Sequence, residues 1–294
     1  MPSLQHQLLT RVIPLVRRSG EVRDPEALRR AVIAARPAQP PVPPARLLRD
    51  FTLTQVEGYG FPVFSLQLAG TSPQRTVVYL HGGGYVSDVD RFHWRFVATV
   101  ARRLGVRVVL PAYPLAPEHT WRDAHPPLLS LCEQVAIESP HGIVLMGDSA
   151  GGGLALALAQ QLVRRPGPQP TRVVLLSPWV DLTGTTPGTA EASVRDPWLR
   201  RSKIDLYASW WAGGDVSAPE VSPLFGELAG LPPVMVFSGT RDTLWPQAAE
   251  LVRRAEAAGV NVTYREEPDL LHVYPILPVP EAKRALDELV SWLQ

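Results

Sequence analysis

The sequence predicts an α/β fold in which a mostly parallel, eight-stranded sheet carries helices on both faces and a helical cap. Short apolar runs typical of buried strands alternate with helical patterns along most of the 294 residues, and short connections join them. The alternation stops over residues 183–222, and an insertion of that length inside an α/β core is usually functional. Hydrophobic residues make up 45% of the chain, enough to bury a substantial core. We therefore expect a core with an appended cap.

The N-terminal segment, residues 1–45, is expected to form cap helices and a stiff connector. Apolar residues recur at helical spacing over residues 3–36, and this pattern breaks near Gly20 and restarts after the N-cap signal Asp24-Pro25. The proline-rich stretch 37–44 cannot continue a helix and should run extended. A disordered arm is one alternative, but the apolar stripes predict that these helices pack on another part of the protein, and a lid over the site is one interpretation.

The core is predicted to occupy residues 46–182 and 223–294. Alternating apolar residues over 51–56 and 61–68, with glycines between them, indicate a β-hairpin at a sheet edge. Six further apolar runs are typical of buried strands: 76–80, 106–110, 142–145, 172–177, 233–238 and 261–265. Helices are expected over 92–104, 122–138, 154–160 and 281–293, and one more over 202–211 in the cap insertion.

The cap insertion, residues 183–222, is rich in aromatic side chains: Trp198, Tyr207, Trp210 and Trp211. Such side chains either line a pocket or pack the cap on the core, and we expect packing alone for about half of them.

Ser149 lies in a predicted strand-to-helix turn. An apolar run ends at Leu145, and a second, helical run begins at Leu154. Gly147 and Gly151 flank the serine in the G-x-S-x-G spacing, because a turn sharp enough to expose a serine hydroxyl above a sheet leaves no room for side chains two positions away. A glycine-rich turn with an N-cap serine is the simpler alternative. The context below favours a nucleophilic serine.

Three consecutive glycines follow the strand 76–80, in His81-Gly-Gly-Gly-Tyr85. Ordering them costs more chain entropy than ordering other residues, so the bare backbone must be required. A phosphate-binding loop is one interpretation, but G-x-G-x-x-G and a following Gly-Lys-Ser/Thr are both missing. An oxyanion hole is the other, with the N–H groups of Gly82 and Gly83 directed at a developing negative oxygen. The second interpretation explains both glycine clusters.

A nucleophilic serine needs a base, and the base needs a group that orients it. In this topology the order along the chain is serine, acid, histidine. His272 is the one histidine after Ser149. Asp242 directly follows the strand 233–238 and should emerge at the same sheet edge as the serine. Asp269 is the alternative acid, and the triad order disfavours it.

The sequence resembles the hormone-sensitive-lipase-like branch of the α/β-hydrolases, which includes many bacterial carboxylesterases. The resemblance runs from about residue 50 to the C-terminus. It is carried by Asp242 and His272 together with five segments: His81-Gly-Gly-Gly-Tyr85, Tyr113-Pro-Leu-Ala-Pro-Glu-His119, Gly147-Asp-Ser-Ala-Gly-Gly152, Ser177-Pro-Trp-Val-Asp-Leu182 and Ser222-Pro-Leu224.

By that resemblance the chain has an α/β-hydrolase fold, with Ser149 as nucleophile, His272 as base and Asp242 as its orienting acid. The oxyanion-hole N–H groups would be those of Gly82, Gly83 and Ala150. The family's cap would correspond to residues 1–45 and 183–222. We expect the substrate-binding residues to be Tyr85, Asp148, Trp179, Trp210, Trp211 and Trp245.

Composition excludes several classes of partner. The net charge is +1, so no overall field draws in nucleic acid or an anionic membrane. A lipase acting at a lipid surface is disfavoured, although one stripe, Leu8-Val12-Leu15 with Arg11, Arg17 and Arg18, would suit such a surface. The single cysteine, Cys132, excludes a disulfide within the chain and fits a cytoplasmic location. A homodimer is expected from the resemblance alone.

The predicted function is that of a serine carboxylesterase, which hydrolyses short- to medium-chain acyl esters through an acyl-enzyme. The chemistry needs no metal and no organic cofactor. An amidase or deacetylase acting on aryl amides is an alternative, because the same triad can serve it. A small-molecule receptor of the same fold is another, and the presence of His272 counts against it.

Overall fold

The structure is a computed structural model that describes residues 1–16 and 20–294. Within these residues, eight strands form one sheet in the order β1-β2-β4-β3-β5-β6-β7-β8. The pairs β1–β2 and β2–β4 are antiparallel, and the pairs from β4 to β8 are parallel. The strands are β1 (Phe51–Val56), β2 (Val63–Leu68), β3 (Thr76–Leu80), β4 (Arg107–Pro111), β5 (Ile143–Asp148), β6 (Arg172–Leu176), β7 (Val234–Gly239) and β8 (Val262–Glu267).

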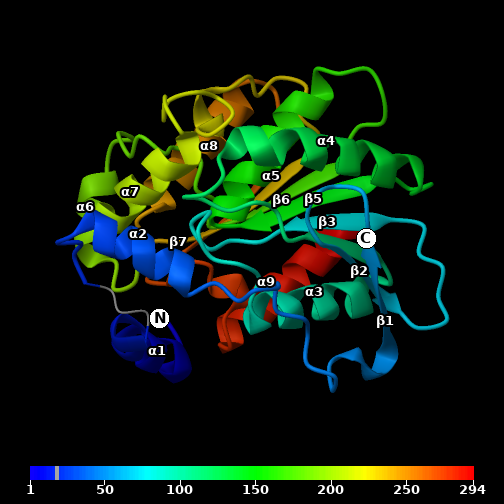
Figure 1. The fold of residues 1–294 in the computed structure, drawn as a ribbon, viewed down its shortest axis with the longest axis horizontal. Coiled ribbons are helices and arrows are strands. Elements are labelled where there is room, and N and C mark those ends of the chain that lie inside the picture. Colours follow the sequence, from blue (N-terminus) through cyan, green and yellow to red (C-terminus); the bar gives the residue numbers. More distant parts are fainter. Residues whose placement is uncertain (17–19) are drawn as a thin grey trace.

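Helices cover both faces of this sheet. In Figure 1, α4, α5 and α8 lie on one face and α3 and α9 on the other. The strands are apolar on both faces, so that Leu145 of β5 packs into one buried cluster while its neighbours Val144 and Met146 pack into another. The core helices are α3 (Arg91–Leu104), α4 (Trp121–Ile137), α5 (Ala150–Val163), α8 (Trp245–Ala257) and α9 (Pro280–Leu293).

The predicted strands are confirmed, including the hairpin of β1 and β2 at the sheet edge, with shifts of a few residues at their ends. The largest shift is in β5, which continues to Asp148 because the pairing with β3 and β6 extends to the turn itself. Two helices were not predicted. One is α8, and the other is α6 (Thr189–Arg195), which has seven residues and lacks a side-chain N-cap. A helix of two turns gives too short an apolar period to be recognised.

The cap segments lie together at one end of the sheet, where α6 and α7 (Arg201–Ala212) stand beside α2 (Pro25–Ala34) (Figure 1). The Asp24 side chain caps α2 by accepting from the N–H of Ala27 at 3.0 Å, as the Asp-Pro signal predicted. The predicted helix break near Gly20 falls partly on residues 17–19, which lie outside the described residues, as do Arg17 and Arg18 of the stripe named above. The division into cap and core remains a prediction.

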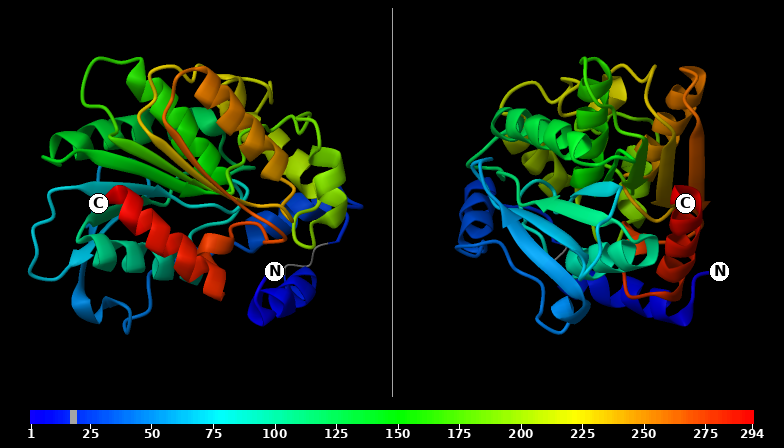
Figure 2. Two further views of the ribbon diagram at one scale, coloured as in Figure 1. Left: turned by 180° about the vertical axis from the view of Figure 1, so that it is seen from behind. Right: turned by 90° about the vertical axis from the view of Figure 1, so that its right-hand side faces the viewer.

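The first helix, α1 (Leu4–Val16), lies apart from α2. Figure 2 shows it beside the chain that enters α9. Its Ile13 is buried in a small cluster with Leu271, Leu277 and Val279. The N-terminal helix therefore packs on the core through Ile13, next to the segment that carries His272. The predicted stripe does not make this contact, because Leu8, Val12 and Leu15 are exposed.

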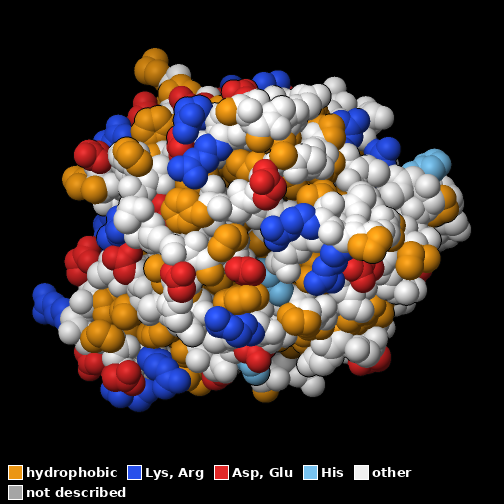
Figure 3. All heavy atoms as spheres, turned by 90° about the horizontal axis from the view of Figure 1, so that it is seen from above, with side chains coloured by type: hydrophobic (Ala, Val, Ile, Leu, Met, Phe, Trp, Pro, Cys, Tyr) orange, Lys and Arg blue, Asp and Glu red, His pale blue; other side chains and the backbone are white. Residues whose placement is uncertain are grey.

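Charged side chains of both signs are interspersed on the face of the molecule seen in Figure 3. No helix within residues 1–16 and 20–294 combines the length and the apolar character needed to cross a bilayer.

The central strand β5 should dominate the stability of the sheet. The side chain of Leu145 is fully buried, so Leu145→Ala should lower the free energy of unfolding by about 2–5 kcal/mol through a cavity that cannot close fully. Denaturant unfolding would measure this. Val194→Ala is the control, since this valine is 85% exposed and should change stability by less than about 0.5 kcal/mol. Equal effects at both positions would contradict the placement of β5 at the centre of the core.

Candidate active site

Ser149 stands between β5 and α5, in the sharp turn that the sequence predicted. Its backbone has φ 52° and ψ −121°, a conformation that non-glycine residues rarely adopt. The Ser149 N–H donates to Leu176 O of β6 at 2.9 Å, and the Ser149 carbonyl accepts from the N–H of Trp179 at 2.9 Å. These bonds keep the strained turn in place and direct the hydroxyl toward the cap side of the sheet.

The glycine spacing around Ser149 has a steric cause. A Cβ on Gly147 would lie 2.2 Å from Gly151 O, and a Cβ on Gly151 would lie 2.0 Å from Leu80 O. Neither contact is compatible with a side chain, so both positions must be glycine. The G-x-S-x-G pattern therefore arises from the packing of α5 against β5 and β3.

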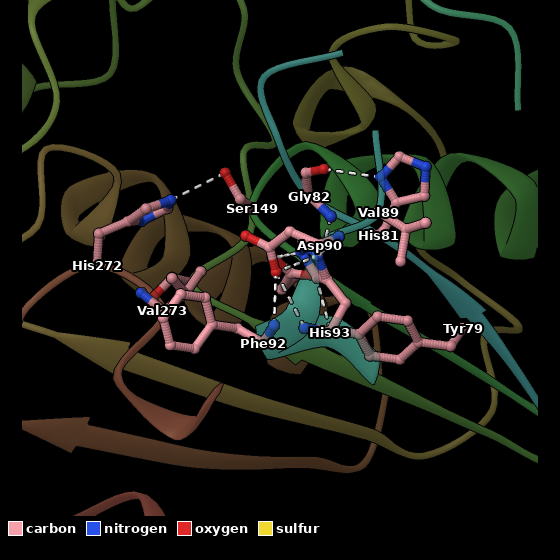
Figure 4. A network of polar contacts seen from close by, with 12 residues as sticks. Tyr79, His81, Gly82, Val89, Asp90, Phe92, His93, Ser149, His272 and Val273 are labelled. Carbon is pink, nitrogen blue, oxygen red and sulfur yellow. Dashed lines mark hydrogen bonds and ion pairs between the residues drawn. The ribbon is translucent and has the colours of Figure 1, made fainter. Parts of the chain in front are cut away.

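Three side chains from distant parts of the chain meet at the hydroxyl of Ser149. His272 Nε2 is 2.9 Å from Ser149 Oγ, and His272 Nδ1 is 2.8 Å from Asp242 Oδ2. The contact of His272 with Ser149 is visible in Figure 4. Because a carboxylate oxygen can only accept, Nδ1 carries the proton and Nε2 is the acceptor for the serine hydroxyl. The structure thus brings Ser149, His272 and Asp242 together, and it is Asp242, not Asp269, that contacts the histidine.

The surroundings of His272 favour its protonated form. Burial lowers the pKa of His272, but the charge of Asp242 and the hydrogen bond to it outweigh burial and hold the pKa above its usual 6.5. The carboxylates of Asp196 and Asp148 add to this effect.

Sequence analysis missed Asp196, a buried carboxylate close to His272 and Asp242. It lies in the cap insertion, and its Oδ2 accepts from the N–H of Thr243, the neighbour of Asp242, at 2.8 Å. Its Oδ1 accepts from the N–H groups of Trp198 and Leu199. Burial and the nearby Asp242 raise the pKa of Asp196. Asp196 thereby ties the cap to the acid loop. Its position before Pro197 was the one sequence signal for it, and many aspartates in turns precede proline.

The glycine loop after β3 departs from its prediction at one residue. The N–H of Gly82 donates to Asp148 Oδ1 at 2.9 Å, so it is not free to bind an oxyanion, and this part of the prediction is wrong. Gly83 and Gly84 line the pocket beside Ser149 instead. Among the described residues, no hydrogen bond engages the N–H of Gly83, Gly84 or Ala150.

Asp148 is the centre of a buried polar network under that loop. Figure 4 shows other members of this network: Tyr79, Gly82, Asp90 and His93. Besides Gly82, it accepts from the Tyr79 hydroxyl at 2.7 Å, and its Oδ2 is 3.4 Å from His93 Nε2. His93 also lies 3.0 Å from Asp90 Oδ1. Burial lowers the pKa of His93, but the two carboxylates raise it to about 10. His93 Nδ1 also accepts from the N–H of Asp90 at 2.9 Å, which places the ring hydrogen on Nε2, toward Asp148. Contacts of the Asp148 carboxylate with Gly82, Tyr79 and His93 therefore fix the glycine loop against β5.

The pocket above Ser149 has a volume of ≈ 240 Å³. One wall consists of the glycine loop, and the opposite wall comes from the cap and from the segment after His272. The apolar members of that wall are Trp198, Leu199, Ile204, Tyr207, Ile276 and Leu277.

The predicted substrate-binding residues divide into two groups. Trp179 and Asp148 line the pocket, although both oxygens of Asp148 are occupied by the network. Tyr85, Trp210, Trp211 and Trp245 are not among its lining residues, and their part in substrate binding stays a prediction.

The reasons lie in packing. Tyr85 stacks on Trp211 at 4.2 Å, and both are buried where the cap meets the core. Trp245 donates from Nε1 to Glu266 at the end of β8. Ile204, Tyr207 and Trp211 share one face of α7, but Trp211 lies in the last turn, where it is buried against Tyr85 rather than over the pocket. Trp198 and Tyr207 are thus the pocket aromatics of the insertion, and spacing alone does not show which turn of a helix lies over a pocket.

Comparison with known proteins identifies the family. Residues 77–276 match the family described as the alpha/beta hydrolase fold. The chain belongs to the α/β-hydrolase family. A solved esterase from the bacterial hormone-sensitive lipase family superposes on this hydrolase with a TM-score of 0.83 and 30% identity, over 100% of this chain and 98% of the other. The hydrolase belongs to that branch.

Curated relatives carry ester-hydrolase names. An acetyl-hydrolase of Streptomyces hygroscopicus is 33% identical over 75% of each chain. A triacylglycerol lipase of Mycobacterium tuberculosis is 35% identical over 68% of this chain, but the hydrolase spans only 42% of that lipase. An esterase of Acinetobacter venetianus is 29% identical over 76% of each chain. The hydrolase is a carboxylic ester hydrolase.

The buried carboxylate beneath the glycine loop gives a prediction about stability. Asp148→Asn should lower the free energy of unfolding by about 3 kcal/mol, because the carboxylate faces Tyr79, Gly82 and His93 and an amide NH₂ group cannot accept from a donor. Asp205→Asn is the control, because Asp205 is the exposed partner of Arg201. This change should lower the free energy of unfolding by less than about 1 kcal/mol.

Proposed function

We propose that Ser149 is the nucleophile of a serine esterase, with His272 as general base and Asp242 as the acid that orients it. The observation that carries the proposal is the continuous chain from Ser149 Oγ through His272 to Asp242, with contacts of 2.9 and 2.8 Å at the base of a pocket. Both distances are within hydrogen-bond reach, which is the first requirement of general-base catalysis.

The oxyanion would be bound by the N–H groups of Gly83, Gly84 and Ala150. This assignment replaces Gly82, whose N–H is taken up by Asp148, with the next glycine of the same loop. Ala150 is the first residue of α5, so its N–H is at the positive end of the helix dipole. Donors fixed in advance at that position stabilise charge only as it develops in the transition state.

The reaction then proceeds in two halves. Ser149 Oγ attacks the ester carbonyl carbon while His272 Nε2 takes the hydroxyl proton, and the tetrahedral intermediate collapses when His272 returns that proton to the leaving alcohol. Water next attacks the acyl-enzyme, His272 takes a proton from it, and the carboxylic acid leaves as Ser149 regains its proton.

Short acyl esters are the substrate class that the pocket supports best. Its ≈ 240 Å³ lies below the roughly 300–1,000 Å³ of sites for drug-sized ligands, and its wall toward the cap is closed by Trp198 and Tyr207. The name of the Streptomyces relative, an acetyl-hydrolase, points in the same direction. An aryl amidase would share the triad, and the assay below separates the two. Cytoplasmic location and homodimer formation remain predictions from the sequence.

The first test is hydrolysis of p-nitrophenyl esters from acetate to dodecanoate by wild type and Ser149→Ala. We expect kcat/KM to be highest for the short acyl chains and to fall by at least about 10⁴-fold in Ser149→Ala. Ser209→Ala is the control, because this serine is exposed on α7 and should leave activity unchanged. A p-nitroanilide turned over faster than the matching ester would favour the amidase, and wild type that is folded but inert on all esters would overturn the proposal.

The pH profile tests the role of His272. Because the base must be neutral and its pKa is raised, kcat/KM should decline with decreasing pH around a midpoint above 6.5. Initial rates of p-nitrophenyl acetate hydrolysis, measured at a series of pH values, would give the midpoint. Activity that persists unchanged to pH 5 would show that His272 is not the base.

A further inference from the structure

A histidine from the N-terminal helix contacts the backbone next to His272. His6 of α1 is fully buried, and its Nε2 is 3.0 Å from the N–H of Leu271. A backbone N–H can only donate, so His6 Nε2 must be unprotonated and its Nδ1 carries the hydrogen. Nδ1 lies 3.9 Å from Glu281 Oε2 on α9. The neutral tautomer of His6 thus fixes the residue that immediately precedes the proposed base.

The loop around His272 needs such support because its backbone is strained. Asp269 has φ 58° and Val273 has φ 49°, in the left-handed region that non-glycine residues avoid and that a β-branched valine avoids most. Strain of this kind persists only where surrounding contacts over-determine the conformation.

Three parts of the chain supply those contacts through hydrogen bonds to the loop backbone. Thr240 Oγ1 accepts from the N–H of Asp269 at 2.9 Å, and Ser177 Oγ accepts from the N–H of Val273 at 2.9 Å. His6 accepts from Leu271, midway between them. The first two acceptors follow strands of the sheet, whereas His6 comes from a helix some 265 residues away in the sequence.

The helix that carries His6 is itself anchored to the same region. The Ser3 hydroxyl donates to Glu281 Oε2 at 3.0 Å, and Ser3 N also donates to that carboxylate. Ile13 packs on the side chain of Leu271 from the other end of the helix. His6 is therefore held between two anchor points and cannot turn away from Leu271 without unseating α1.

We propose that His6 is a positioning residue for the esterase: in its neutral form it accepts the Leu271 N–H and so sets the place of His272 relative to Ser149. This inference rests on the proposed function. Its consequence is that α1 takes part in the alignment of the catalytic groups even though it contributes no described residue to the pocket wall.

The inference has a pH signature. Protonation of His6 would place a hydrogen on Nε2, directly against the Leu271 N–H, and the loop would lose its central contact. Burial lowers the pKa of His6, Glu281 on α9 raises it, and Arg241 on the loop before α8 lowers it, with a net result below 6.5. The loop itself carries Asp269 and His272. Protonation of His6 thus follows that of His272 as pH falls.

Three variants separate positioning from structural damage. His6→Leu removes the acceptor and leaves a buried N–H without a partner, so kcat for p-nitrophenyl acetate should fall by about tenfold while KM changes less than twofold. His6→Gln can place its side-chain oxygen near the position of Nε2 and should restore kcat to within about threefold of wild type. Gln5→Leu is the control: it also introduces a leucine on α1, but at an exposed position, and it should leave kcat unchanged.

The acid limb of the wild-type profile gives a measurement that does not depend on how His6→Leu folds. Log kcat/KM should fall with a slope near one as His272 is protonated, and the slope should exceed one over about one pH unit at lower pH, where protonation of His6 removes about a further tenfold of activity. In His6→Gln the slope should stay near one.

Hydrogen exchange of residues 268–274 should report faster exchange in His6→Leu than in His6→Gln. Equal kcat in wild type and His6→Leu, or the same slope in wild type and His6→Gln, would overturn the inference while leaving the role of Ser149 intact. Loss of the Ser149→Ala effect would instead overturn the proposed function.

Discussion

The turn at Ser149 joins β5 to α5 with almost no free space around it. Gly151 sits so close to the backbone of β3 that a single methyl group would overlap Leu80 O, and Gly147 is equally confined by Gly151. This close approach allows α5 to begin directly at the end of the strand. It also forces Ser149 into a positive φ. The exposed hydroxyl, the helix N-terminus and the neighbouring strand ends are all consequences of this packing.

A buried polar network connects that turn to the glycine loop and fixes the position of the loop. Asp148 is the last residue of β5 and precedes Ser149, so its carboxylate has a fixed place relative to the serine. From there it accepts from Gly82 of the loop and lies against His93 of α3. Burying a carboxylate costs solvation free energy, and the polar contacts to both of its oxygens compensate this cost. The network leaves Gly83 and Gly84 facing the pocket.

The histidine side of the site depends on segments that are remote in the sequence. Asp242 contacts His272, Asp196 of the cap ties down the acid loop, and His6 of α1 contacts the residue before His272. The serine side belongs to the central sheet, whereas the histidine side is assembled from the cap, the N-terminus and a strained loop. Changes in the cap or in α1 should therefore act on the base before they act on the nucleophile.

The sequence by itself determined the alternation of strands and helices, the elbow at Ser149 and the order of Ser149, Asp242 and His272, because these follow from local periodicity and from glycines that sterics require. Only the tertiary structure decided which N–H groups of the glycine loop are free, since Gly82 is engaged by a carboxylate 66 residues away. It also decided which aromatics line the pocket: Trp198 and Tyr207 rather than Trp210 and Trp211. The position of each residue along α7 and the contact between cap and core fix that choice, and neither is encoded in spacing. His6 and Asp196 could not be found from sequence for the same reason, because a buried polar side chain gains its role from the partner that folding places beside it.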